Sequence, residues 1–162
     1  MRVGLDFDRV LFKTDEFNEY LKEQTGLHHV DADVYDEDGC YSPKKHAEAS
    51  GVDVEKVYEA LEDLSQFLYE DLAKLEEIDD HEFVIVTRGE QKFQRAKIKA
   101  SGADQFVEKI FVVQSEAKDV GDIDFLVDDR EKEIHRAEIP GLVLDRKKHS
   151  LDHLISFLGD KK

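Results

Sequence analysis

Two aspartates spaced Asp-x-Asp follow an apolar run at the start of the chain. Val3-Gly-Leu leads into Asp6 and Asp8, and a second apolar stretch ends at Phe12. A short apolar run is typical of a buried strand in a parallel sheet, where ligands bind beyond the carboxyl ends of the strands. Two carboxylates there repel each other. A divalent cation, a shared proton, or a division into nucleophile and acid/base group would each stabilise the pair.

Later apolar runs also end in polar groups. Thr87 and Arg88 end one run, Asp128 and Asp129 end another, and Lys118 lies in the loop before the second. Each residue alone has an ordinary explanation as a helix cap or a solvated side chain. Together, on the strand ends of one sheet and in this order, they predict a single site.

Strands and helices alternate in the second half of the chain. This alternation predicts an α/β fold with a parallel sheet and right-handed crossovers. We expect helices over 90–101, 131–138 and from Ser150 onward. The expected strands are 2–7, 83–86, 110–113, 125–127 and 142–144.

The segment between the first two strands is too long for a simple crossover. Its apolar residues recur mostly at helical spacing, so we predict a helical insert, or cap, over residues 13–79. The core is then formed by residues 1–12 and 80–162. Within the insert we expect helices from an N-cap at Thr14 to Gly26, from Pro43 to Gly51, and one long amphipathic helix or two in succession over 54–78.

Composition excludes several classes of protein. The net charge of -16 argues against nucleic acid and anionic membranes as partners. No apolar run approaches the roughly 20 residues that span a bilayer, and Met1-Arg2 leads directly into a strand without a signal peptide. Cys40 is the single cysteine, which fits a reducing compartment. We therefore expect a cytoplasmic protein.

These motifs resemble those of the haloacid dehalogenase-like (HAD) hydrolase superfamily. Asp6 and Asp8 resemble its first motif, Thr87 its second and Lys118 its third. The Asp128-Asp129 pair resembles the fourth motif in the form that the 5′-nucleotidase branch also has. The resemblance covers about 1–12 and 80–145. It implies a Rossmannoid three-layer α/β/α core with a parallel five-stranded sheet. Residues 13–79 match no motif, and only their position resembles a small C1-type cap.

The resemblance implies hydrolysis of a small phosphorylated metabolite through an aspartyl-phosphate. Asp6 would attack the phosphorus, and Asp8 would act as general acid and then as general base. Thr87 and Lys118 would hold phosphoryl oxygens. The implied cofactor is Mg²⁺, which suits an all-oxygen set of ligands. Its ligands would be Asp6, the backbone carbonyl of Asp8, Asp128, and Asp129 directly or through water.

Arg9 departs from the family pattern, which most often has glycine there. It either reaches the substrate or faces solvent and pairs with the acidic surface. Arg88 is a further candidate for substrate contact, and Tyr35, Tyr41 and Lys44 are candidates within the cap.

Other functions remain as alternatives. A non-catalytic or regulatory relative that binds a phosphorylated ligand or a protein would retain the same residues. A dehalogenase is disfavoured because it needs no acid two residues after its nucleophile. A phospho-receiver domain is disfavoured because its acidic pair comes first in the chain.

Overall fold

Five strands form one parallel sheet in the computed structural model, which describes residues 1–159. The spatial order is β3-β2-β1-β4-β5, so β1 lies at the centre. The predicted α/β fold with a parallel five-stranded sheet is confirmed. The last three residues of the expected core lie outside the described part of the chain. The strands are β1 Arg2–Leu5, β2 Glu82–Arg88, β3 Ile110–Val113, β4 Phe125–Asp128 and β5 Gly141–Val143.

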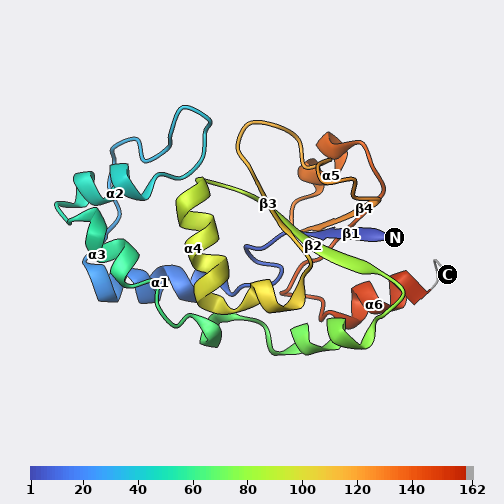
Figure 1. Ribbon diagram of the computed structural model, residues 1–162. Coiled ribbons are helices and arrows are strands. Elements are labelled where there is room, and N and C mark those ends of the chain that lie inside the picture. Colours follow the sequence, from blue (N-terminus) through green and yellow to red (C-terminus); the bar gives the residue numbers. More distant parts are fainter. Residues whose placement is uncertain (160–162) are drawn as a thin grey trace.

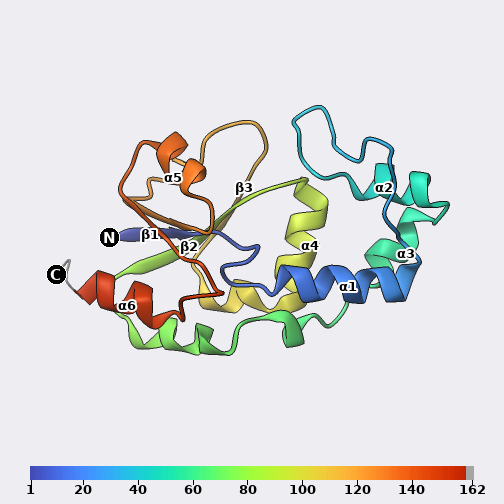
Figure 2. The same cartoon turned by 180° about the vertical axis from the view of Figure 1, so that it is seen from behind.

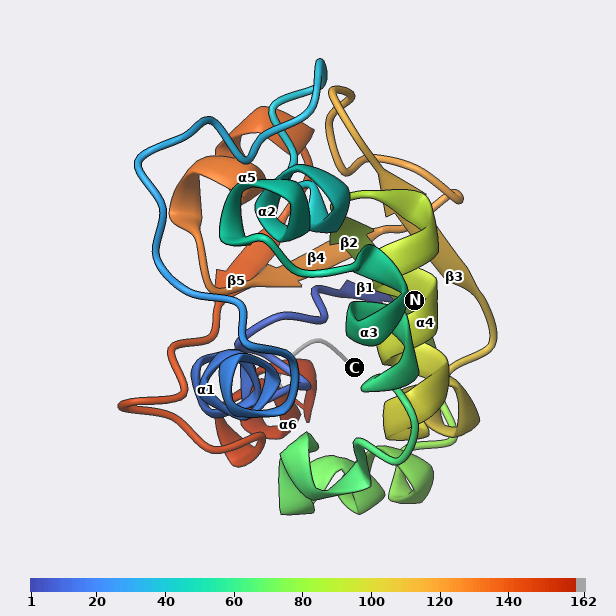
Figure 3. The same ribbon diagram turned by 90° about the vertical axis from the view of Figure 1, so that its left-hand side faces the viewer.

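Helices cover both faces of the sheet, which gives three layers. On one face, Val3 and Leu5 pack in a core that includes α4 (Gln91–Ser101) and α6 (Asp152–Gly159). On the other face, a smaller cluster joins β2 and β4 to α5 (Glu131–Ala137). Figure 3 shows the strands between α5 and α6.

Helices α1 to α3 lie past the carboxyl ends of the strands. Figures 1 and 2 show them at the end of the molecule opposite the N-terminus. Ser42 caps α2 by accepting a hydrogen bond from the amide of Lys45, and Gly26 and Gly51 end α1 and α2 in the left-handed region. The helices are α1 Thr14–Thr25, α2 Pro43–Ser50 and α3 Val54–Glu59.

Of the two alternatives predicted over 54–78, the single long helix is wrong. After α3 the chain forms two short 3₁₀ segments, η1 (Ser65–Phe67) and η2 (Glu70–Glu77). Backbone groups next to these segments bond to other parts of the chain. The amide of Leu64 donates to the carbonyl of Ala100, and the amide of Tyr69 donates to the carbonyl of Leu11. These tertiary bonds replace the bonds that a continuous helix would make. The limits of a cap at residues 13 and 79 stay a prediction.

Two other boundaries differ from expectation near the first strand. β1 ends at Leu5 rather than at residue 7, because the carbonyl of Phe7 accepts turn bonds from Val10, Leu11 and Phe12. Thr14 is the first residue of α1 and caps nothing, because its hydroxyl bonds to Asp8 instead.

No helix within residues 1–159 is both long enough and apolar enough to cross a membrane.

Candidate active site

Asp6 lies directly beyond the central strand, beside Asp128 at the end of β4. The backbone amide of Asp6 donates to the carbonyl of Val127 over 2.9 Å, which continues the β1–β4 pairing by one residue. Lys118 Nζ lies between the two carboxylates, 3.1 Å from Asp6 Oδ1 and 2.6 Å from Asp128 Oδ2. All three side chains are buried. The two strand ends and the loop before β4 thus build one buried ionic cluster.

Asp129 joins this cluster at its more exposed side. Carboxylate oxygens of Asp6, Asp128 and Asp129 all lie within 4.8 Å of one another. Three converging carboxylates fit a hard divalent cation, which prefers oxygen ligands. The residues present therefore suit Mg²⁺, with water completing its shell.

The carboxylates of this cluster outnumber its one lysine, and the pKa values of its members are shifted. Burial raises the pKa of Asp6 well above its usual range, although Lys118 opposes the shift, and Asp128 adds to it. Burial also raises the pKa of Asp128 against the same opposition. Burial would lower the pKa of Lys118, but Asp6 and Asp128 outweigh it and the pKa is raised. One lysine does not fully compensate these carboxylates, so a bound cation would stabilise their ionised forms.

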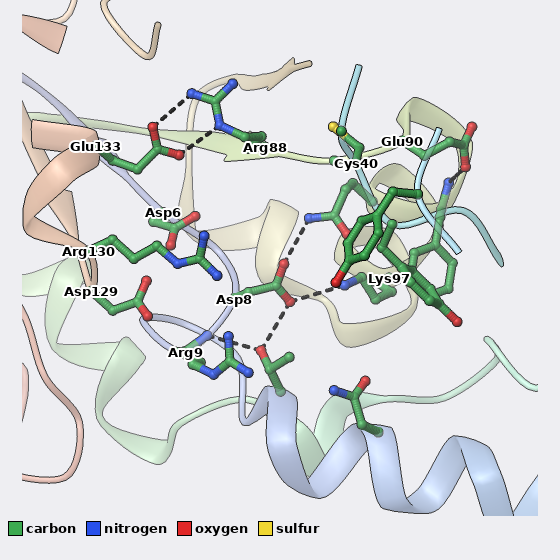
Figure 4. A pocket seen from close by; sticks show the side chains of 18 of the residues that line it. Asp6, Asp8, Arg9, Cys40, Arg88, Glu90, Lys97, Asp129, Arg130 and Glu133 are labelled. Atoms are coloured by element: carbon green, nitrogen blue, oxygen red, sulfur yellow. Dashed lines mark hydrogen bonds and ion pairs between the residues drawn. The ribbon is translucent and has the colours of Figure 1, made fainter. Parts of the chain in front are cut away.

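Asp8 points away from that cluster, toward α4, as Figure 4 shows. Its Oδ1 accepts hydrogen bonds from Lys97 Nζ and Thr14 Oγ1, both over 3.0 Å. Its Oδ2 accepts one from Gln94 Nε2 over 2.9 Å. Burial would raise the pKa of Asp8, but the charge of Lys97 and these hydrogen bonds outweigh it, and the pKa is lowered.

The fold of this chain is similar to the folds of solved protein structures. A haloacid dehalogenase-like family hydrolase from Xanthomonas campestris superimposes with a TM-score of 0.52 at 15% identity, over 93% of this chain and 85% of that one. YfnB from Bacillus subtilis, described as a HAD-hydrolase bound to magnesium, gives a TM-score of 0.60 at 12% identity, over 97% of both chains. The chain has the HAD-like fold. No protein-family model matches it, and the search of curated proteins gives no significant match.

Thr87, the last residue but one of β2, is fully buried. Its Oγ1 accepts a hydrogen bond from Gln94 Nε2 over 2.8 Å, and the same nitrogen donates to Asp8. Gln94 therefore links two of the predicted site residues. A Cβ on Gly89 would lie 2.5 Å from Gln94 Cγ, so glycine leaves the space that this side chain occupies.

Arg88 is held by protein groups rather than free for a substrate. Its guanidinium makes two bonds to Glu133, of 2.7 and 2.8 Å, which Figure 4 shows. It also donates to the carbonyls of Gln114 and Glu116. These carbonyls belong to the loop that carries Lys118, and Glu133 Oε2 lies 3.9 Å from Lys118 Nζ. Arg88 therefore fixes the loop of Lys118. It also lines the pocket, and its contact with a substrate stays a prediction.

A pocket of about 500 Å³ opens between the strand ends and the segment before α2. Arg9 lines it and also pairs with Asp15 over 3.0 Å at an exposed site. Of the cap candidates, Tyr35 and Tyr41 line this pocket and Lys44 does not. Both interpretations of Arg9 are thus compatible with its position.

Sequence reasoning did not identify Gln94 or Lys97, although both are buried and touch Asp8. A signal was present. Gln94, Lys97 and Ser101 lie three and four residues apart, next to Phe93 and Ile98, and so fall on the buried stripe of α4. Polar residues on an apolar stripe need buried partners.

Proposed function

We propose that the protein is a Mg²⁺-dependent phosphatase of a small phosphomonoester. The observation that carries this proposal is the cluster at the pocket floor, where Asp6 lies 3.1 Å from Lys118 and shares a cation-binding arrangement with Asp128 and Asp129. A nucleophilic carboxylate, a buried lysine and three oxygen donors are the groups that phosphoryl transfer requires.

The charge of the pocket supports a dianionic substrate. The whole chain carries a net charge of -16, yet the pocket wall is balanced. A divalent cation would leave a surplus of two positive charges, which matches a phosphomonoester dianion. The wall has six acidic and six basic side chains: Asp6, Asp8, Glu90, Asp128, Asp129 and Glu133 against Arg9, Lys22, Arg88, Lys97, Lys118 and Arg130.

The reaction then proceeds in two displacements. An oxygen of Asp6 forms a bond to phosphorus as the ester P–O bond breaks, and the leaving oxygen takes a proton from Asp8. Asp8 next takes a proton from a water molecule, which attacks the aspartyl-phosphate, releases inorganic phosphate and restores Asp6. Lys118 stabilises charge on the phosphoryl oxygens. Bound Mg²⁺, held by Asp6, Asp128 and Asp129, would supply further charge neutralisation.

The test is turnover of 4-nitrophenyl phosphate with Mg²⁺ and with EDTA. We expect Mg²⁺-dependent turnover that Asp6→Asn lowers by at least about 10³-fold, because the nucleophile is lost. Asp104→Asn, the same change at an exposed position, is the matched control. Undiminished turnover by Asp6→Asn would refute the nucleophile.

A panel of phosphorylated metabolites that includes nucleoside monophosphates would then identify the substrate class. If no phosphomonoester is hydrolysed while Mg²⁺ binds normally, the regulatory alternative is favoured.

A further inference from the structure

Lys97 is a buried lysine that the proposed chemistry does not use. Its side chain is 5% exposed, and its Nζ lies 3.0 Å from Asp8 Oδ1. The same nitrogen lies 4.7 Å from the ring centre of Phe93, and 5.8 Å from those of Phe7 and Phe17. An ammonium group among aromatic rings is costly to bury unless it is paired. The pairing partner of Lys97 is Asp8, the predicted acid/base residue.

Both oxygens of Asp8 are held from two elements of the fold. Lys97 and Gln94 lie one turn apart on α4, and Thr14 starts α1. The two α4 side chains take one carboxylate oxygen each, over 3.0 and 2.9 Å. A carboxylate held at both oxygens has a fixed side-chain rotation as well as a fixed place. The orientation of Asp8 is therefore set largely by α4.

We propose that Lys97 is a positioning residue for Asp8, with Gln94 as its partner, and that it fixes the direction from which the Asp8 carboxylate meets the substrate. This inference rests on the proposed function. Lys97 acts through Asp8 and does not itself hold the phosphoryl group. Gln94 ties the same carboxylate to Thr87, so α4 aligns Asp8 with a predicted phosphate-binding side chain.

A simpler role would be a structural ion pair that only stabilises the fold. The two roles differ in what they predict for Asp8 variants. A structural role lowers stability and leaves catalysis by folded protein unchanged. A positioning role lowers catalysis, and only while Asp8 is present to be positioned.

The experiment is a double-mutant cycle with Lys97→Met and Asp8→Asn. Methionine replaces the ammonium with an apolar group of similar length among the phenylalanine rings. We expect kcat to fall roughly tenfold to a hundredfold with little change in KM, because a small misplacement of a catalytic group costs this much. In the Asp8→Asn background the same substitution should change kcat less than about twofold. Lys99→Met, two residues along α4 at an exposed position, is the matched control and should leave turnover unchanged.

A second measurement keeps the test decisive if Asp8→Asn is too slow to assay. An alkyl phosphate needs a proton on its leaving oxygen, whereas 4-nitrophenolate leaves readily without one. Lys97→Met should therefore lose more activity on the alkyl phosphate. Equal losses on both substrates, or equal losses with and without Asp8, would overturn the inference. A wild-type protein that hydrolyses no phosphomonoester would instead refute the proposed function, and this inference with it.

Discussion

Asp6 and Asp8 lie two residues apart in opposite electrostatic surroundings. Asp6 faces other carboxylates with Lys118 between them, and burial raises its pKa. Asp8 is half-buried and faces hydrogen-bond donors, and its pKa is lowered. Two residues of one type thus receive different properties from their neighbours, which is how a site assigns two roles to two carboxylates.

The difference has a chemical consequence for each step of the proposed reaction. Asp6 must be ionised to attack phosphorus, so it needs a cation beyond Lys118. The lowered pKa of Asp8 favours its ionised form, which is the form that takes a proton from water, over the protonated form that donates to the leaving oxygen.

Among variants that keep both aspartates, the largest expected effect comes from replacing Lys118, the ammonium group of the Asp6 cluster. Lys118→Met should lower turnover by about 10²- to 10³-fold, because a group that stabilises phosphoryl charge is lost. The same change should tighten Mg²⁺ binding, because a positive charge 2.6 Å from Asp128 and 3.1 Å from Asp6 is removed. Kinetics and calorimetric titration with Mg²⁺ would measure the two opposite changes. Weaker Mg²⁺ binding would contradict the proposed ligands, and Lys148→Met at an exposed position is the control.

Sequence reasoning located the Asp6 side of the site well. Short apolar runs that end in carboxylates or threonine define strand ends, and the carboxyl ends of parallel strands must meet at one edge. The structure places Asp6, Lys118, Asp128 and Asp129 together there. The identities of these residues and their order in the chain carried enough information.

The backbone path after α3, and the identity of the partner of Gln94 and Lys97, depended on packing between distant segments that no local pattern contains. Leu64, Phe67 and Leu68 have a spacing that suits α and 3₁₀ turns alike, and hydrogen bonds to distant segments decide between them. That Asp8 is the partner of Gln94 and Lys97 likewise follows from where α4 meets the loop after β1. The wrong helix over 54–78 and the failure to identify Gln94 and Lys97 both concern contacts between segments far apart in sequence.

A third carboxylate tests whether a half-buried ion pair outside the pocket affects catalysis. Asp71 makes bonds of 2.7 and 3.0 Å to Arg146 and accepts from the amide of Leu151, outside the pocket. Asp71→Asn should lower the free energy of unfolding by about 1–3 kcal/mol. It should leave turnover within about twofold of wild type, unlike Lys97→Met. Denaturant unfolding and phosphatase assays would compare the two variants, and a large loss of turnover in Asp71→Asn would contradict the distinction.

The pH dependence of that stability follows from the pKa of Asp71. Burial would raise this pKa, but the hydrogen bonds from Arg146 and Leu151 outweigh it, and the pKa is lowered. The stabilisation is therefore fully present above the ordinary aspartate pKa of about 3.9 and is lost as the pH falls through the folded value. The gap in stability between wild type and Asp71→Asn should shrink below about pH 4.

The smallest expected effect concerns the turn at Arg9, directly after Asp8. Arg9 has a φ of 64°, in the left-handed region, and its amide donates to the carbonyl of Phe12 and to Thr14 Oγ1. Side chains with a Cβ adopt this region at a cost of about 1 kcal/mol, and glycine does not pay it. Arg9→Gly should therefore be more stable than Arg9→Ala by about 1 kcal/mol in denaturant unfolding, although both remove the guanidinium.

Turnover by the same two variants separates the two interpretations of Arg9. Equal losses in Arg9→Gly and Arg9→Ala would mean that the guanidinium contacts the substrate, because both variants lack it. A loss confined to Arg9→Ala would mean that the shape of the turn matters, since only glycine relieves the backbone there. Equal stability of Arg9→Ala and Arg9→Gly would contradict the left-handed backbone conformation of residue 9.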